Sequence, residues 1–179
     1  MKWFNEPSRW EVQPDGAIEL NTSPKTDFWQ ITHYDFVRDN GHFYYEEVEG
    51  DFIAEVKILG KYQDLYDQAG LMVRLDASNW LKCGIEFVDG LQKVSAVNTR
   101  DFSDWSVVPI GENPPAIYLR VIRERETLEA HYSFDGENYT LLRLGYLKPG
   151  HKLMVGVMAA SPDGGGFPVR FERLSIKQN

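Results

Sequence analysis

Residues 68–75 read QAGLMVRL, residues 76–79 read DASN, and residues 80–87 read WLKCGIEF. Apolar side chains occupy every second position of the first and third stretches, which is typical of a β-strand with one buried face. The residues between them are small or polar and suit a tight turn. The sequence therefore predicts an antiparallel hairpin whose buried face carries Ala69, Leu71, Val73, Leu75, Leu81, Cys83, Ile85 and Phe87.

The same alternation recurs on both sides of this hairpin. It is clearest at residues 52–58 and 128–134, and further strands are expected at residues 17–20, 43–48, 94–99, 117–123, 139–144, 153–160 and 169–176. Tight hairpin turns are expected at Asp15-Gly16, Asn40-Gly41, Asp89-Gly90, Asp135-Gly136 and Asp163-Gly164. About a dozen strands without a helix cannot form one open sheet without exposing an apolar face. The sequence predicts an all-β fold, a two-sheet antiparallel β-sandwich, in a single domain over residues 1–179.

The composition argues against several classes of partner. The formal net charge is -8, with 27 acidic and 19 basic side chains and no basic run, which argues against nucleic acid and against an anionic membrane. No stretch reaches the roughly 20 apolar residues of a membrane span, and the first residues lack the apolar core of a secretory signal. Cys83 is the lone cysteine, so no intramolecular disulfide forms, and we expect a reducing, cytoplasmic location.

The outward face of the predicted hairpin has an unusual set of polar side chains. Gln68 and Arg74 lie on its first strand, and Lys82 and Glu86 lie on the second, so all four share one surface. Glycines at positions 70 and 84 remove side chains and hollow that surface in this interpretation. Forked donors, an amide and a carboxylate suit the hydroxyl groups of a sugar. The alternative is a cross-strand ion cluster that keeps an outer sheet soluble.

Three blocks of the chain carry a resemblance to a known family. They are YDQAGLMVR at residues 66–74, NWLKCGIEF at residues 79–87 and FSDWS at residues 102–106. These blocks are similar to the uncharacterised concanavalin A-like family that includes the fungal regulation-of-enolase protein. A similar run occurs in the jelly-roll domains appended to some β-xylosidases. The resemblance implies a concanavalin A-like jelly roll whose concave face is lined by Gln68, Arg74, Lys82 and Glu86, and it implies no established activity.

Two further segments are candidate walls of that concave face. Trp29 and His33 are expected on a segment that closes over the groove, and Asp104 and Trp105 are expected to form another wall. A tryptophan in either place would stack on a sugar ring. Both tryptophans are also large enough to be core anchors, and this alternative stays open.

The sequence predicts no catalytic residue, metal or cofactor. A retaining glycosidase needs two carboxyl groups about 5–5.5 Å apart, and Glu86 and Asp89 are oddly spaced across a predicted turn. The four histidines are scattered without the spacing of zinc ligands. Calcium ligands could come from Asp64 and Asp67 or from Asp101 and Asp104, but loop aspartates more often cap turns.

The leading hypothesis from the sequence is therefore non-catalytic binding of a carbohydrate or a sugar-derived metabolite in the concave face. Two alternatives remain. One is an intracellular regulatory domain that contacts a protein partner and is linked to carbon metabolism, which only the resemblance suggests. The other is a glycoside hydrolase with an unusual pair of carboxylates.

Overall fold

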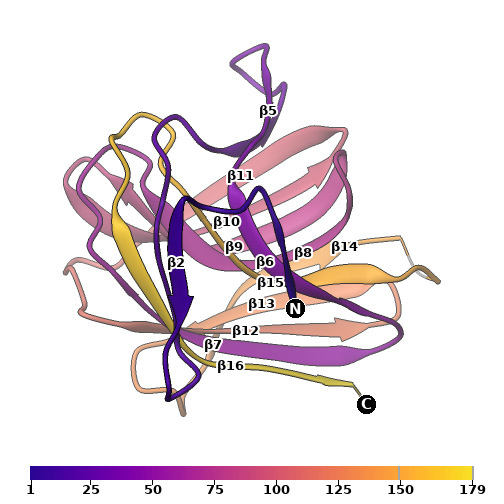
Figure 1. Ribbon diagram of the computed structural model, residues 1–179. Coiled ribbons are helices and arrows are strands. Elements are labelled where there is room, and N and C mark those ends of the chain that lie inside the picture. Colours follow the sequence, from indigo (N-terminus) through magenta and orange to yellow (C-terminus); the bar gives the residue numbers. More distant parts are fainter. Residues whose placement is uncertain (149, 179) are drawn as a thin grey trace.

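The computed structural model describes residues 1–148 and 150–178, and these residues form sixteen strands and no helix. Two curved antiparallel sheets lie face to face (Figure 1). The first sheet runs β1 (Lys2–Phe4), β6 (His42–Val48), β15 (Leu153–Ala160), β8 (Gln68–Asp76), β9 (Asn79–Val88), β10 (Leu91–Arg100), β11 (Phe102–Pro109). The second runs β14 (Thr140–Tyr146), β13 (Thr127–Ser133), β12 (Ile117–Glu124), β7 (Phe52–Gly60), β16 (Pro168–Gln178), β3 (Ile18–Asn21), β2 (Arg9–Val12). The predicted two-sheet sandwich is confirmed.

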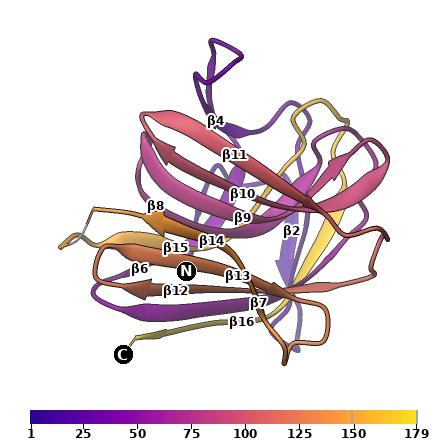
Figure 2. The same cartoon turned by 180° about the vertical axis from the view of Figure 1, so that it is seen from behind.

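A third, two-stranded unit pairs β4 (Phe28–Gln30) with β5 (Val37–Asp39). This hairpin, residues 28–39, is called the covering hairpin below. It stands on the outer side of the first sheet, at the top of both ribbon views (Figures 1 and 2). The described residues include no helix long and apolar enough to cross a membrane.

The strongest sequence patterns all became strands. The quoted stretch forms β8 and β9, joined by a turn at residues 77–78. The short strands β1, β2, β4 and β5 and the edge strand β11 were not predicted. Strand β11 has a mixed burial pattern, because it pairs on one side only, and such a strand shows no regular alternation.

The main core lies between the two sheets. The inward residues of β8 and β9, which include Leu71, Leu81 and Cys83, pack with Val56 of β7 and Leu119 of β12. Cys83 is 3% exposed, and burial raises the pKa of its thiol to about 12. The prediction that this cysteine faces inward is confirmed, and its thiol is held in the unreactive protonated form.

The expected Asp-Gly and Asn-Gly turns do not all require glycine for the same reason. Asp89 and Gly90 both have left-handed φ angles, 56° and 77°, and they join β9 to β10 in a two-residue turn. Gly41 is not left-handed. A Cβ atom there would lie 2.4 Å from the ring of Phe28, so this position needs glycine because the aromatic ring packs against its backbone.

The outer face of the first sheet is covered rather than open. Phe28 and Trp29 of the covering hairpin pack onto it and are 0% and 8% exposed. They join a second apolar cluster with Phe43, Tyr45, Met72, Trp80, Val97, Met158 and Ala160. The expected shallow groove on this face is thus largely filled, because an N-terminal segment far away in the sequence folds back across it.

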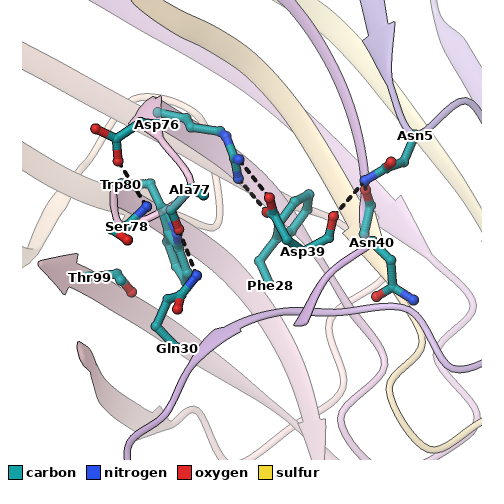
Figure 3. Close-up of polar contacts among 12 residues, drawn as sticks. Asn5, Phe28, Gln30, Asp39, Asn40, Asp76, Ala77, Ser78, Trp80 and Thr99 are labelled. Atoms are coloured by element: carbon teal, nitrogen blue, oxygen red, sulfur yellow. Dashed lines mark hydrogen bonds and ion pairs between the residues drawn. The ribbon is translucent and has the colours of Figure 1, made fainter. Parts of the chain in front are cut away.

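Arg74 fastens the covering hairpin to the sheet. Its Nη1 and Nη2 atoms donate to the two carboxylate oxygens of Asp39 at 2.5 and 2.8 Å, and its side chain is 4% exposed. The guanidinium lies 4.6 Å from the ring centroid of Phe4. Figure 3 shows Asp39 beside Phe28, with Asn5 donating to the Asp39 carbonyl. This bidentate ion pair fixes both the distance and the orientation of the covering hairpin relative to the first sheet.

The other strand of the covering hairpin has its own anchors. The side-chain amide of Gln30 donates to the carbonyl of Ala77, in the turn between β8 and β9, at 2.8 Å (Figure 3). The backbone N–H of Gln30 donates to Ser103 Oγ at 2.9 Å. The hairpin is thus tied to the first sheet at two separate places.

Gly70 and Gly84 lie directly opposite each other on β8 and β9. A Cβ atom on Gly70 would lie 1.9 Å from the carbonyl oxygen of Cys83. We expect Gly70→Ala to lower the free energy of unfolding by about 1–3 kcal/mol in a urea titration, because backbone must move to admit the methyl group. Gly165→Ala is the control, since Gly165 has open space around it and no left-handed φ. Equal stability of the two variants would contradict the close approach.

Removing one or the other partner of the Arg74–Asp39 ion pair should lower the stability by unequal amounts. Asp39→Asn leaves a buried guanidinium without a carboxylate, and we expect a loss of roughly 3–5 kcal/mol in the free energy of unfolding. Arg74→Met leaves Asp39, whose side chain is 27% exposed and can be hydrated, so the loss should be smaller. Urea unfolding of both variants measures which one loses more free energy of unfolding. A larger loss in Arg74→Met than in Asp39→Asn would show that Arg74 does not depend on Asp39.

Candidate functional site

A pocket of about 180 Å³ lies between the covering hairpin and the first sheet. Its lining residues are Asp27, Trp29, Tyr34, Phe36, Arg38, Tyr66, Gln68, Lys82, Glu86, Val97, Trp105, Pro162 and Asp163. Pockets for drug-sized molecules begin at about 300 Å³, so this one has room for a single small ring. Polar groups meet in its floor and aromatic rings form its walls.

Lys82 stands in the floor of the pocket and is 6% exposed. Its Nζ atom donates to Gln68 Oε1 at 2.7 Å, to the carbonyl of Phe28 at 2.7 Å, and to Asp27 Oδ1 at 3.3 Å. An ammonium group has three N–H donors, so each is already used within the protein. Lys82 therefore holds the floor together and has no donor left for a ligand.

Gln68 and Asp27 complete this floor. The Gln68 amide nitrogen donates to Asp27 Oδ1 at 3.4 Å and to the carbonyl of Tyr66 at 3.2 Å. Asp27 Oδ1 also accepts from the backbone N–H of Phe28 at 2.7 Å. Within the described residues, no hydrogen bond engages Asp27 Oδ2. One oxygen of this carboxylate thus remains available to a ligand.

Glu86 is the second carboxyl group of the pocket, and it is 9% exposed. Its Oε2 atom accepts from the indole N–H of Trp105 at 2.7 Å. Burial raises the pKa of Glu86 above its ordinary value, although the charge of Lys82 and hydrogen bonds from Ser95 and Trp105 oppose this. In the part of the chain that the structure describes, Oε1 has no hydrogen-bond partner.

The walls of the pocket are aromatic and come from both sides. On the covering hairpin, Tyr34 lies between Trp29 and Phe36, with ring centroids 5.7 and 5.4 Å away. On the sheet side, Tyr66 packs edge-on against Trp105 at 6.3 Å. Hydrogen bonding to the Tyr34 side chain is the main cause that raises the pKa of Tyr66 to about 12. The two walls therefore meet at this tyrosine pair.

Five of the eight residues singled out in the sequence line this pocket: Gln68, Lys82, Glu86, Trp29 and Trp105. Arg74 lies on the same face of the sheet but is sealed beneath Phe4 and paired with Asp39. It cannot reach a ligand in the pocket, so its expected role as a sugar donor does not fit the structure.

His33 and Asp104 also lie outside the lining. His33 is exposed at the tip of the covering hairpin, with a left-handed φ of 68°. Asp104 neighbours Trp105 on β11, so its side chain points to the opposite face, where it is 74% exposed and lies 3.9 Å from Arg143. The expectation that both residues form walls of the groove is wrong for this reason.

The sequence analysis missed Asp27, Phe36, Arg38 and Tyr66 as lining residues. Tyr66 stands at the start of the first block of family resemblance, but nothing in its local pattern marks it as functional. It adopts a left-handed φ of 66°, which turns the chain at the pocket rim. Asp27 reaches Lys82 only because residues 27–41 cross the sheet, and no spacing rule relates positions 27 and 82.

The two aspartate pairs considered for calcium behave as loop caps or surface groups. The Asp67 carboxylate accepts from the backbone N–H groups of Gln63 and Asp64 at 2.9 Å, and from Ser161 Oγ at 2.6 Å. Among the described residues, no group of three or more His, Cys, Asp or Glu side chains is arranged to hold a metal ion.

A larger groove of about 750 Å³ lies along the second sheet, near Trp10, Leu20 and Val169. Its central cation, Arg170 of β16, is bound to Glu172 on the same strand and to Glu19 on the neighbouring strand β3. The groove thus offers an ion network that is closed on itself, whereas the smaller pocket has free carboxylate oxygens among aromatic rings. We therefore regard the smaller pocket as the candidate functional site.

A named yeast relative matches most of this chain. It is "Regulation of enolase protein 1" of Saccharomyces cerevisiae, which is 42% identical over 174 residues, covering 97% of this chain and 87% of the relative. A crystal structure of a functionally unknown protein from Saccharomyces cerevisiae is 41% identical and superposes with a TM-score of 0.94, covering 99% of this chain and 96% of that one.

More distant solved structures share the fold alone. Xylan β-1,4-xylosidase from Bacillus halodurans matches with a TM-score of 0.75 and 15% identity, over 97% of this chain but only 35% of the enzyme. The carbohydrate binding module CBM66 from Bacillus subtilis matches with a TM-score of 0.62 and 15% identity, over 98% of this chain and 95% of the module. The expected jelly-roll likeness, including that to β-xylosidases, is confirmed.

The model of one protein family spans nearly the whole chain, from residue 3 to residue 179. Together with the yeast relative, this match confirms the resemblance drawn from residues 66–106. The chain belongs to the family described as "Protein of unknown function (DUF1349)".

Proposed function

We propose that this protein binds a small sugar or sugar-derived ligand in the pocket under the covering hairpin and does not transform it. The observation that carries the proposal is the combination of two free carboxylate oxygens, on Asp27 and Glu86, with the aromatic walls around them. Sugar hydroxyls donate to carboxylates in the plane of the ring, while the apolar ring faces pack on aromatic side chains.

The size and position of the pocket agree with this proposal. A volume of about 180 Å³ suits a single sugar ring rather than a chain. The fold neighbour CBM66 is by its name a carbohydrate binding module, which supports the same class of ligand. Fold likeness at this level of identity is an analogy, so the lining residues have to carry the argument.

A regulatory role is the second candidate. The yeast relative, at 42% identity, is named for the regulation of enolase. The edge strand β14 exposes Leu141 and Leu144, at 54% and 62%, and an edge strand with exposed apolar side chains suits contact with a protein partner. Sugar binding and regulation are compatible, because a bound metabolite can report on carbon supply. We place this activity in the cytoplasm, in keeping with the lone buried Cys83.

The first test is a thermal-shift screen against neutral monosaccharides and amino sugars, because a ligand that binds only the folded state raises the melting temperature. For a monosaccharide that binds, we expect Glu86→Ala to weaken affinity about ten- to hundredfold, as for other hydrogen bonds to a charged group. Asp104→Ala is the matched control on the opposite face. Binding unchanged by Glu86→Ala would exclude this pocket, and a flat screen would favour the regulatory role.

Glu86 also makes a prediction about stability and pH. Its folded-state pKa is raised above the ordinary 4.5 by burial. A raised pKa favours folding while the group is protonated, and this contribution is lost as the pH rises through the folded-state pKa. Above that pKa, Glu86→Gln is expected to melt at a higher temperature than the unaltered protein, because glutamine cannot ionise. The melting temperatures should converge at acidic pH, and a difference independent of pH would contradict the ionisation of Glu86.

A further inference from the structure

Glu86 is a buried carboxyl group that lacks a cationic partner. Arg74 lies six residues from Gln68 along β8, opposite Trp80, and is paired with Asp39, whereas Lys82 lies 3.3 Å from Asp27 Oδ1. Within the described residues, Glu86 forms no ion pair, and its hydrogen-bonding neighbours, Trp105 and Ser95, are both uncharged. Buried charges in proteins are normally paired, so this side chain is built for a partner that the chain does not supply.

The charges that line the pocket favour a positively charged ligand group next to Glu86. Its lining holds three carboxyl groups, Asp27, Glu86 and Asp163, and two cations, Lys82 and Arg38. Lys82 has no free N–H donor, as described above. Arg38 donates to the carbonyl of Pro162 at 3.3 Å and lies 4.7 Å from the ring centroid of Phe36. The arrangement leaves a formal excess of one negative charge on the lining.

The aromatic walls add to this preference. The rings of Trp29, Tyr34, Tyr66 and Trp105 line the same pocket as the Glu86 carboxyl group. The faces of aromatic rings are electron-rich and attract cations, most strongly where water is excluded. A phosphate or carboxylate in the same place would face Glu86 and Asp163 instead.

We infer that the ligand is an amino sugar whose protonated amine docks against Glu86 Oε1. This inference rests on the proposed function and narrows it, because the ring hydroxyls would still bind Asp27 Oδ2 and the aromatic walls. The ammonium group completes the ion pair that Glu86 lacks in the free protein. Sugars with a phosphate or an acid group in that position are excluded by the same charges.

Isothermal titration calorimetry with glucosamine, glucose and N-acetylglucosamine tests the inference at neutral pH, where the amine of glucosamine is largely protonated. We expect glucosamine to bind at least about tenfold more tightly than the other two, since only it brings a charge to Glu86. Glu86→Gln has the same shape without the charge and should abolish the preference. Asp89→Asn removes a carboxylate from an exposed turn outside the pocket and should keep it.

The outcomes separate this inference from the proposed function. If glucose or N-acetylglucosamine binds as tightly as glucosamine, the amine preference is wrong while sugar binding stands. If the preference survives in Glu86→Gln, the ammonium group does not dock on Glu86 and the inference is overturned. If none of the three sugars binds, both the inference and the proposed function fail.

Discussion

Two buried cations on the outer face of the first sheet set the constraint on which the rest of the structure depends. Arg74 and Lys82 are 3% and 6% exposed, and a buried cation needs a carboxylate close by. Asp39 and Asp27 supply these carboxylates, and they lie just at the two ends of the covering hairpin. The hairpin therefore lies where it does because its two acidic ends meet the two cations of the sheet.

This arrangement explains why a pocket forms on one side of the covering hairpin only. Around Arg74, Phe4 and Phe28 fill the space beside the ion pair with Asp39. Around Lys82, the sheet continues to Glu86, and the hairpin offers Trp29 and Tyr34 as an aromatic wall, with Arg38 turned to the carbonyl of Pro162. The same covering segment thus closes one half of the face and leaves the other half as a small acidic pocket.

The pocket contains a feature that costs stability. Burial disfavours the ionised form of Glu86, which has no ion-pair partner among the described residues, and carboxyl groups perturbed in this way cluster at functional sites. The sandwich core between the sheets, with Leu71, Leu81 and Val56, is closed and apolar and has no such residue. Distant relatives of the same fold include an enzyme and a binding module, so fold alone does not decide between activities, and the lining residues do.

The sequence by itself determined the sandwich and part of the site. Apolar and polar residues alternate along residues 68–75 and 80–87. This pattern is local in the sequence, so it was enough to predict β8, β9 and their buried face. It also placed Gln68, Lys82 and Glu86 together, because strand geometry relates neighbours across a hairpin. Only the tertiary structure decided that Asp27 meets Lys82, that Asp39 seals Arg74, and that Asp104 points away. The first two contacts join residues that are 55 and 35 positions apart in the sequence. The orientation of Asp104 depends on which face of the edge strand β11 is covered. A local alternation of apolar and polar residues predicts neither.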